Sequence, residues 1–261
     1  MPQTIAVLSQ KGGTGKTTTV RTVTDVLRRS GVRTLAIDLD PQGNLSDYFD
    51  LPTDVQPTVA DVLAGRVQAS EAIHQDIIPA NLTLAETELM LGGKMGRELT
   101  LRRALAKLED YDVVLIDCPP SLGLLTINAL VAANHALVTA EAQYFALQGV
   151  EQALEVVNLA RDSLNPELSL LGVMMNLADM RTVHSREALV SLQERFGEKV
   201  FQTVIRSSIA YAESAEQARS ILDHRSDLGA DYVALTDELL SRLGDLNGAR
   251  KQLAKLQSSL T

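Results

Sequence analysis

Apolar residues follow two alternating patterns along this chain. Short runs rich in Val, Ile and Leu predict buried strands at residues 4–9, 34–38, 82–85, 113–117, 136–140, 170–175 and 200–205. Longer segments with apolar residues at helical spacing predict helices at residues 16–30, 99–109, 124–133, 147–164, 185–196, 211–222 and 231–243. Alternation of strands with helices indicates βαβ units. We therefore expect an α/β fold with a mostly parallel, twisted sheet flanked by helices and joined by right-handed crossovers.

No internal repeat, low-complexity block or long linker interrupts these patterns. A chain of 261 residues fits one large α/β domain or two small ones, and we expect a single domain over residues 1–261. The strand signal weakens between residues 47 and 96, where we expect a helical insertion. Residues 245–261 are expected to form a C-terminal tail helix.

The composition limits which residues can form the core and indicates the cellular compartment of the protein. Aromatic residues make up only 3% of the chain and Trp is absent, so aliphatic side chains must build the core. Cys118 is the single cysteine, which excludes a disulfide within one chain and suits a reducing compartment. The N-terminus lacks the features of a signal peptide, and no stretch approaches the roughly 18 apolar residues of a membrane span. We therefore expect a cytoplasmic protein.

A glycine-rich segment, SQKGGTGKTT at residues 9–18, lies between the first predicted strand and the first predicted helix. It fits the end of the phosphate-binding pattern G-x-x-x-x-G-K-[ST], with Gln10 at the first glycine position and a second lysine, Lys11. Lys16 is expected to reach the β- and γ-phosphates and the Thr17 hydroxyl to bind Mg²⁺. A glycine-rich turn with surface lysines is the alternative, and the strand–loop–helix context disfavours it. The expected nucleotide-binding residues are Lys11, Gly12, Gly13, Thr14, Gly15, Lys16, Thr17 and Thr18.

Carboxylates follow two of the predicted strands. Asp117 ends the apolar run VVLID, and Asp38 and Asp40 end and follow the run TLAID. Because ligands of parallel sheets bind at the carboxyl ends of strands, both sites are expected beside the glycine-rich loop. Asp117 is placed to hold Mg²⁺ or its water, and Asp40 to orient an attacking water. The alternative for each is an aspartate that caps a turn or helix.

Three segments of the chain resemble those of the deviant-Walker partition ATPases ParA and Soj. They are KGGTGKTT at residues 11–18, DLDPQGN at 38–44 and DCPPSLGLLTINAL at 117–130. Further similar segments are QYFALQGV at 143–150, DMRT at 179–182 and FGEKVFQTVI at 196–205. The similarity extends from about residue 5 to residue 243. The lack of a helix-turn-helix before the loop is typical of the short, chromosomal type.

The resemblance implies a slow, Mg²⁺-dependent ATPase with ATP as cofactor. Lys11 matches the signature lysine, which crosses a nucleotide-sandwich homodimer to the partner subunit's phosphates. Lys16 matches the P-loop lysine, and Asp40 the aspartate that supports hydrolysis. Thr17, Asp40 and Asp117 are the implied residues around Mg²⁺. The resemblance also implies nonspecific DNA binding by the ATP-bound dimer on the nucleoid, and a ParB-like or other cargo adaptor that stimulates hydrolysis.

DNA contact needs a local basic patch, because the net charge is −9. Arg181 matches one family arginine implicated in that contact. A second family stretch, PRNVRLSEAPSxGKPI, is RSSIAYAESAEQARSI here, so Arg206 replaces its proline, Ala210 an implicated arginine and Arg219 its lysine. Arg181, Arg206 and Arg219 are therefore the expected DNA-binding residues, and a solvated mixed-charge face is the alternative. Asn176 ends a predicted strand and is expected to contact the adenine edge, unless it is a simple turn residue.

Three other classes of protein fit less well. A membrane-associated positioning ATPase like MinD needs an amphipathic C-terminal anchor, and the tail at residues 249–261 lacks the aromatics that deepen insertion, so no membrane partner is expected. An iron–sulfur reductase needs cluster cysteines, which the single Cys118 does not supply. A binding module without activity is disfavoured because the phosphate-binding and carboxylate residues occur together.

Overall fold

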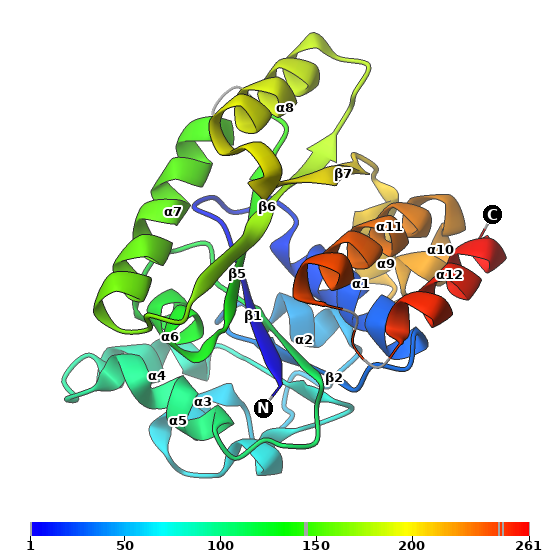
Figure 1. Ribbon diagram of the computed structural model, residues 1–261. Coiled ribbons are helices and arrows are strands. Elements are labelled where there is room, and N and C mark those ends of the chain that lie inside the picture. Colours follow the sequence, from blue (N-terminus) through cyan, green and yellow to red (C-terminus); the bar gives the residue numbers. More distant parts are fainter. Residues whose placement is uncertain (1, 144–145, 245, 247, 261) are drawn as a thin grey trace.

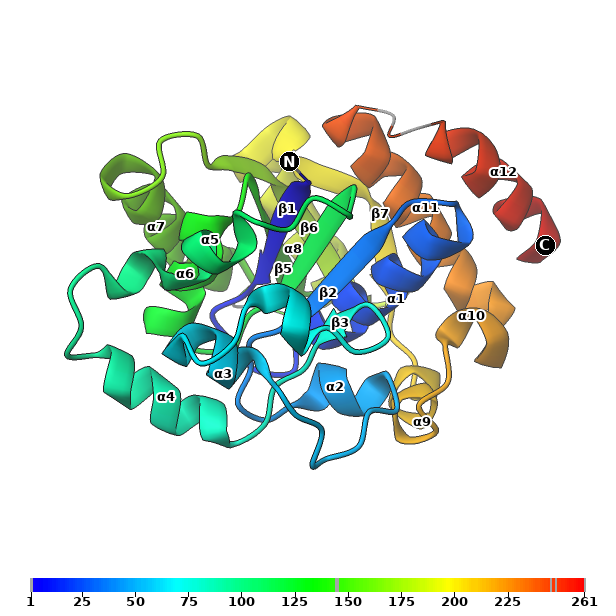
Figure 2. The ribbon, with the colours of Figure 1, turned by 90° about the horizontal axis from the view of Figure 1, so that it is seen from below.

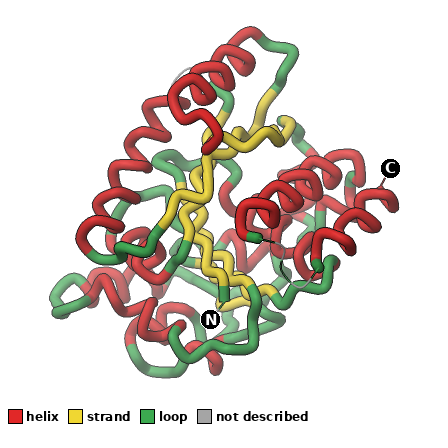
Figure 3. Tube along the Cα trace, in the orientation of Figure 1, coloured by secondary structure: helices red, strands yellow, loops and turns green. Residues whose placement is uncertain are grey.

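The computed structural model describes residues 2–143, 146–244, 246 and 248–260. Seven strands form one sheet in the order β3-β2-β4-β1-β5-β6-β7, and every pairing between them is parallel. The strands are β1 (Gln3–Leu8), β2 (Thr34–Asp38), β3 (Ile77–Ile78), β4 (Val113–Asp117), β5 (His135–Glu141), β6 (Ser169–Ala178) and β7 (Val200–Arg206). The α/β class with a parallel, helix-flanked sheet is therefore confirmed (Figures 1 and 3).

Helices cover both faces of this sheet. They are α1 (Lys16–Arg29), α2 (Asn44–Tyr48), α3 (Val59–Ala64), α4 (Thr83–Leu91), α5 (Thr100–Leu105), α6 (Leu124–Ala132), α7 (Ala146–Ser163), α8 (Val183–Phe196), α9 (Ala210–Glu216), α10 (Ile221–His224), α11 (Ser226–Leu243) and α12 (Ala249–Leu260). Short 3₁₀ turns lie at Ala69–Ala72, Arg97–Leu99 and Gly197–Lys199. Figures 1 and 2 show α6, α7 and α8 on one side of the sheet and α1, α11 and α12 on the other.

The alternation of side chains along β1 divides the core into two apolar clusters. Ala6 and Leu8 point into the cluster that includes residues of α3 to α8. Ile5 and Val7 point into the cluster that includes residues of α1, α2 and α9 to α12. Successive side chains of a strand face opposite sides of a sheet, so a strand covered on both faces must be apolar throughout. That requirement explains why the central strands read as continuous Val, Ile and Leu runs.

The prediction of a strand at residues 82–85 is wrong. The edge strand is β3, where Ile77 and Ile78 are fully buried and pair with Ala36 and Ile37 of β2. Residues 83–91 form helix α4 instead, which buries Leu84 and Leu91. Two isoleucines are too short a run to stand out as a periodic signal. The segment at residues 47–96 is therefore not purely helical, since it contains this edge strand as well as α3 and α4.

Three predicted helices have clearly different bounds in the structure. The helix expected at residues 99–109 is α5, which ends at Leu105. The helix expected at residues 211–222 is divided into α9 and α10, and Ala218 between them has a left-handed φ of 47°. A residue in the left-handed conformation cannot continue a right-handed helix, so the helix is interrupted there. The last core helix, α11, begins at Ser226 rather than at residue 231. The C-terminal tail forms α12, and residues 245, 247 and 261 of that tail lie outside the described residues.

Across the described ranges, no helix is both long enough and apolar enough to cross a membrane.

Candidate functional site: a phosphate-binding loop between two strand-end carboxylates

The glycine-rich loop runs from the end of β1 to the start of α1, at the carboxyl edge of the sheet. Gly13 and Gly15 have left-handed φ angles of 76° and 79°. A Cβ atom at Gly15 would lie 2.1 Å from Asn176 Nδ2, so no larger residue fits there without a rearrangement. The Asn176 amide donates a 2.9 Å hydrogen bond to the Thr14 carbonyl. These contacts hold the loop in one conformation, and glycine-rich loops before a helix bind phosphates through their backbone N–H groups.

Asn176 is buried, and both ends of its amide are used within the protein. Its Nδ2 bonds to Thr14 and its Oδ1 accepts from the backbone N–H of Leu177 at 2.9 Å. These contacts fasten β6 to the loop. A contact between Asn176 and an adenine edge remains a prediction.

Lys16 opens helix α1 and is buried beneath the loop. Its Nζ donates to Ser9 Oγ at 3.0 Å and to the Lys11 carbonyl at 3.2 Å. Burial lowers the pKa of Lys16, while the charges of Asp117, Cys118 and Asp40 act in the opposite direction. A buried ammonium is stabilised when an anion replaces the lost water, so this lysine is suited to a phosphate.

Ser9 is a site residue that the sequence analysis did not single out. Its hydroxyl accepts from Lys16, donates to the Lys11 carbonyl at 2.7 Å and lies 2.8 Å from Thr14 Oγ1. Thr14 Oγ1 in turn lies 3.0 Å from Thr139 Oγ1 of β5. A polar residue that ends the strand before the loop was the available signal for Ser9. Thr139 gave no local signal, because it meets the loop across 125 residues of chain.

Asp117 and Asp38 lie side by side because β4 and β2 are neighbours in exact parallel register at these two residues. Thr17 Oγ1 donates to Asp117 Oδ2 at 2.7 Å. Asp117 Oδ1 is buried and has no hydrogen-bond partner among the residues that the structure describes. Burial and the charge of Asp38 raise the pKa of Asp117 well above its usual range. A buried carboxylate oxygen without a donor is suited to a cation or to a cation's water.

The carboxylate of Asp38, in contrast, already accepts hydrogen bonds from nearby residues of the chain. Its carboxylate accepts from the Ser46 hydroxyl and backbone N–H at 2.8 and 2.9 Å, and from the Asp40 N–H at 3.1 Å. Burial raises the pKa of Asp38 to about 6. The side chain therefore anchors the turn after β2. This turn brings Asp40 to the cavity, where its Oδ1 accepts from the Gln42 N–H at 3.0 Å.

A cavity of about 880 Å³ opens over the loop and reaches toward α2 and α9. Its floor includes Gly12, Gly13, Gly15, Lys16, Thr17 and Thr18, and its walls include Asp40, Tyr48, Ser208 and Tyr211. This volume lies in the range of small-molecule and cofactor sites. The left-handed glycines, the buried Lys16 and the Asp117 oxygen that lacks a hydrogen-bond partner together fit a nucleoside triphosphate with its Mg²⁺ ion.

The three arginines expected to contact DNA are exposed but engaged with acidic or carbonyl groups. Arg181 makes two 2.8 Å hydrogen bonds to the Asp179 carboxylate, which lower the pKa of Asp179 to about 2. Arg206 bonds to Asp231 at 2.8 Å and to the Asp227 carbonyl. Arg219 bonds to the Asp223 carbonyl at 2.7 Å. A phosphate backbone would have to compete with these contacts.

Cys118 and the histidines form no metal centre in the described part of the chain, where no group of three His, Cys, Asp or Glu residues is placed to hold an ion. Cys118 is buried, and burial raises the pKa of its thiol far above the ordinary value.

The parallel sheet and the loop with its neighbouring carboxylates define the class of P-loop ATPases, and ATP and Mg²⁺ are the cofactors of this protein. Residues 2–170 match the AAA_31 family model, an AAA domain. The chain is 36% identical to the sporulation initiation inhibitor protein Soj of Bacillus subtilis, covering 92% of this chain and 98% of Soj. It is also 36% identical to the chromosome partitioning protein ParA of Caulobacter vibrioides, covering 92% and 95%. The chain belongs to the ParA/Soj family of partition ATPases.

Solved structures agree with this assignment of fold and cofactor. A Mycobacterium smegmatis protein described as cobyrinic acid a,c-diamide synthase, with bound ADP and magnesium, superposes with a TM-score of 0.76 at 41% identity. The match covers 86% of this chain and 95% of that one. The septum site-determining protein MinD of Pyrococcus horikoshii, with Mg-ADP, shares the fold at a TM-score of 0.75 and 23% identity, over 94% and 98% of the two chains.

Proposed function

We propose that this protein is an ATP-dependent dimerising switch for chromosome or plasmid partition, or for cargo positioning. The ATP-bound dimer binds DNA nonspecifically, and a ParB-like or other adaptor stimulates hydrolysis and releases it. The observation that carries this proposal is the meeting of Lys16, Thr17 and Asp117 at one edge of the sheet, with Thr17 and Asp117 2.7 Å apart. The relatives Soj and ParA support the partition role.

The loop binds and orients the phosphates. The N–H groups of Gly12, Gly13, Thr14 and Gly15 and the start of α1, including Thr18, form the cradle, and Lys16 supplies the buried positive charge. Thr17 Oγ and Asp117 are the residues that would hold Mg²⁺, directly or through water. When bound, Mg²⁺ supplies a positive charge that stabilises the charge developing on the phosphates during hydrolysis.

Asp40 positions the attacking water. It follows the turn that Asp38 anchors, and its carboxylate lines the same cavity as Lys16 and Thr17. A carboxylate there orients a water molecule and accepts its proton rather than gripping a phosphate. Binding of ATP and its hydrolysis therefore depend on different residues.

Lys11 joins two subunits. Its side chain is exposed at the rim of the loop, whereas Lys16 is buried beneath the loop. In a closed two-fold dimer, each Lys11 reaches the nucleotide of the partner subunit. ATP then favours the dimer because the dimer offers it one more cation than the monomer does.

DNA binding uses Arg181, Arg206 and Arg219, and it places the ATP-bound dimer on the nucleoid. These arginines lie in the loop after β6, at the end of β7 and between α9 and α10, all in the C-terminal half of the chain. Their carboxylate and carbonyl partners compete with DNA phosphates and keep the affinity of each contact low. DNA binding therefore needs the arginines of both subunits of the dimer.

A membrane-positioning role like that of MinD is disfavoured by the packing of α12. Leu253 and Ala249, on the apolar face of that helix, are buried in the core cluster that also contains α1 and α11. Figure 2 shows α12 lying along α11. A helix whose apolar face is already covered has little left to insert into a bilayer.

Two assays on the purified protein test the proposal. Light scattering should show a dimer with a non-hydrolysable ATP analogue and a monomer with ADP. A DNA mobility shift at fixed, stated salt should appear only in the first condition. An ATP-binding monomer that never shifts DNA would instead favour a metabolic ATPase role, such as that in the name of the M. smegmatis relative.

A further inference from the structure

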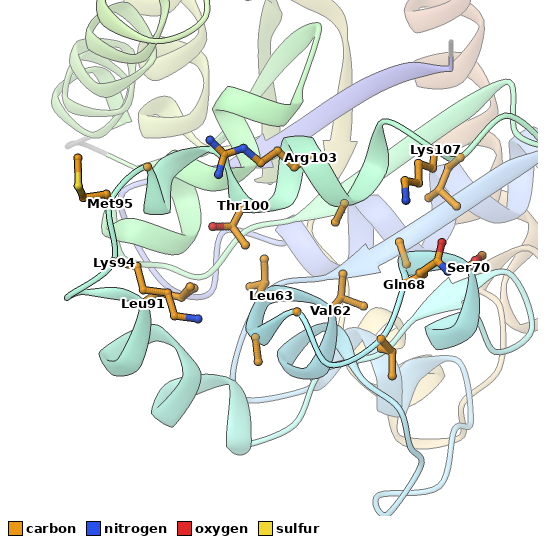
Figure 4. A pocket seen from close by; sticks show the side chains of 17 residues that line it. Val62, Leu63, Gln68, Ser70, Leu91, Lys94, Met95, Thr100, Arg103 and Lys107 are labelled. Atoms are coloured by element: carbon orange, nitrogen blue, oxygen red, sulfur yellow. The ribbon is translucent and has the colours of Figure 1, made fainter.

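A second groove lies apart from the nucleotide cavity and shares no lining residue with it. It has a volume of about 410 Å³ and is formed by α3, α5 and the loop after α4. Figure 4 shows Val62 and Leu63 in its middle, with Lys94, Arg103 and Lys107 placed around them. The groove therefore combines an apolar floor with a ring of cations.

The charge of this groove is opposite to that of the whole protein. Its 17 lining residues include Lys94, Arg103 and Lys107 but no Asp or Glu, although the chain carries a net charge of −9. Ion pairs do not neutralise these cations within the described residues, where all three are exposed.

Two carboxylates close to the groove in the sequence pair with other arginines. Asp61 of α3 pairs with Arg66 at 3.0 Å, and Glu98 pairs with Arg97 at 3.0 Å. Neither is left to balance the cations of the groove. The groove therefore offers three exposed cations to an acidic ligand.

Exposed apolar side chains also gather on the segment that contains α4, and one of them, Met95, lines the groove. In the described part of the chain, four of the eight large exposed apolar residues lie between positions 82 and 95, namely Leu82, Leu89, Met90 and Met95. Met95, which lines the groove, is 99% exposed. Exposed apolar patches of this kind mark interaction surfaces, and flexible methionines adapt to the side chains of a partner.

We propose that this groove binds an acidic amphipathic segment of a partner protein. The apolar side chains of that segment would pack on the half-buried Val67 and Ala104 and on the exposed Met95. Its carboxylates would pair with Lys94, Arg103 and Lys107. The proposal does not depend on the nucleotide site. A small anion would leave the apolar floor uncovered. A DNA backbone would meet the cations but gain nothing from the floor, since phosphate contacts are electrostatic. A helix with one apolar face and flanking Asp and Glu residues satisfies both parts.

A peptide selection on the full-length protein tests this proposal. The library holds helical peptides of about 18 residues, five turns, with leucines at i, i+3, i+4 and i+7 and with Glu, Lys or Gln randomised at the flanking positions. We expect the selected peptides to be enriched in Glu and to bind more weakly as salt rises. Selected peptides with no bias toward Glu would overturn the proposal.

Two adjacent arginines supply the variant and its control. Arg103 lines the groove, whereas Arg102, on the same helix, lines a different surface hollow. Arg103→Glu should weaken binding of a selected peptide by about tenfold at low salt, and Arg102→Glu by no more than about twofold. Equal reductions in the two variants would contradict the assignment of the groove. Met95→Ser, at a fully exposed position that carries no packing, should also weaken binding and serves if Arg103→Glu fails to fold.

The same variants exclude other anionic occupants. A DNA duplex and vesicles containing anionic lipid are tested against the wild type, Arg103→Glu and Arg102→Glu. We expect both probes to bind these three proteins alike. If Arg103→Glu selectively abolishes binding of DNA or of vesicles, and no acidic peptide is selected, the groove is a nucleic-acid or lipid surface and the proposal is wrong.

Discussion

The Thr17 hydroxyl donates a 2.7 Å hydrogen bond to Asp117 Oδ2, across 100 residues of chain. Thr17 lies in the first turn of α1 and Asp117 at the end of β4, so the bond joins the phosphate-binding loop to the neighbouring strand. The other oxygen of Asp117 is buried without a partner in the described residues.

Lys16→Ala should abolish nucleotide binding. The variant removes the buried ammonium that lies under the loop, and a charged hydrogen bond to phosphate has no substitute there. We expect the affinity for ATP to fall by roughly 100-fold or more in calorimetry. Lys251→Ala, an exposed lysine on α12, is the control and should bind as the wild type does. Normal ATP binding by Lys16→Ala would show that the loop is not the phosphate site.

Asp117→Asn should stabilise the ligand-free protein and destroy its response to Mg²⁺. Burial raises the pKa of Asp38 to about 6 from 3.8, and raises that of Asp117 as well. Between pH 3.8 and about 6, the folded protein therefore binds more protons than the unfolded chain. Its free energy of unfolding increases as the pH falls through this range and decreases as the pH rises. Removing one charge of the pair should raise the melting temperature at pH 7 by a few degrees and flatten the pH dependence.

Thermal unfolding between pH 5 and 8, with and without ATP and Mg²⁺, measures both effects. The wild type should gain extra stability from ATP when Mg²⁺ is added, and Asp117→Asn should not. Asp54→Asn, at an exposed carboxylate outside the cavity, should follow the wild type in both respects. A drop in the melting temperature of ligand-free Asp117→Asn would mean that this carboxylate stabilises the fold.

Asp40→Ala should separate ATP binding from hydrolysis. The carboxylate lines the cavity without gripping the loop, so its loss should leave ATP affinity within about threefold of the wild type. Removing a residue that orients water should lower turnover by about 100-fold or more. A phosphate-release assay beside a binding titration checks this, and Asp54→Ala is the control. Turnover equal to that of the wild type would remove Asp40 from the mechanism.

Lys11→Ala should bind ATP as a monomer. The side chain is exposed at the rim of the loop, and its proposed phosphate contact exists only in the dimer. Light scattering with a non-hydrolysable ATP analogue should show a dimer for the wild type and for Lys251→Ala, and a monomer for Lys11→Ala. The DNA shift should disappear together with dimerisation. A Lys11→Ala protein that dimerises normally would exclude the cross-subunit role.

Asp179→Asn should strengthen DNA binding, and Arg181→Ala should weaken it. The Asp179 carboxylate holds Arg181 by two 2.8 Å hydrogen bonds, and neutralising it frees the arginine for a phosphate. In mobility shifts across a salt series, Arg181→Ala should lower the salt slope by about one unit for each phosphate that the variant no longer neutralises. If neither variant changes the affinity of the ATP-bound protein, DNA does not contact the loop after β6.

The sequence alone was sufficient for the fold class and for the centre of the site. Strand, glycine-rich loop and helix follow each other within one short segment, so Lys16 and Thr17 could be placed from local pattern. Asp117 could be placed because a carboxylate that ends a buried parallel strand must lie at the ligand-binding edge of the sheet. Both inferences need only the residues that directly precede and follow each position in the sequence.

The tertiary structure decided what depends on residues far apart. Asp38 and Asp117 look alike as strand-end carboxylates, and only the Ser46 hydrogen bonds show that Asp38 anchors a turn while Asp117 keeps an open oxygen. The edge strand β3 was missed because two isoleucines become a strand only through their pairing with β2. The acidic and carbonyl partners of the arginines and the basic groove between α3 and α5 had no local signal either. Such features arise when packing brings distant segments together, and a one-dimensional pattern does not contain those distances.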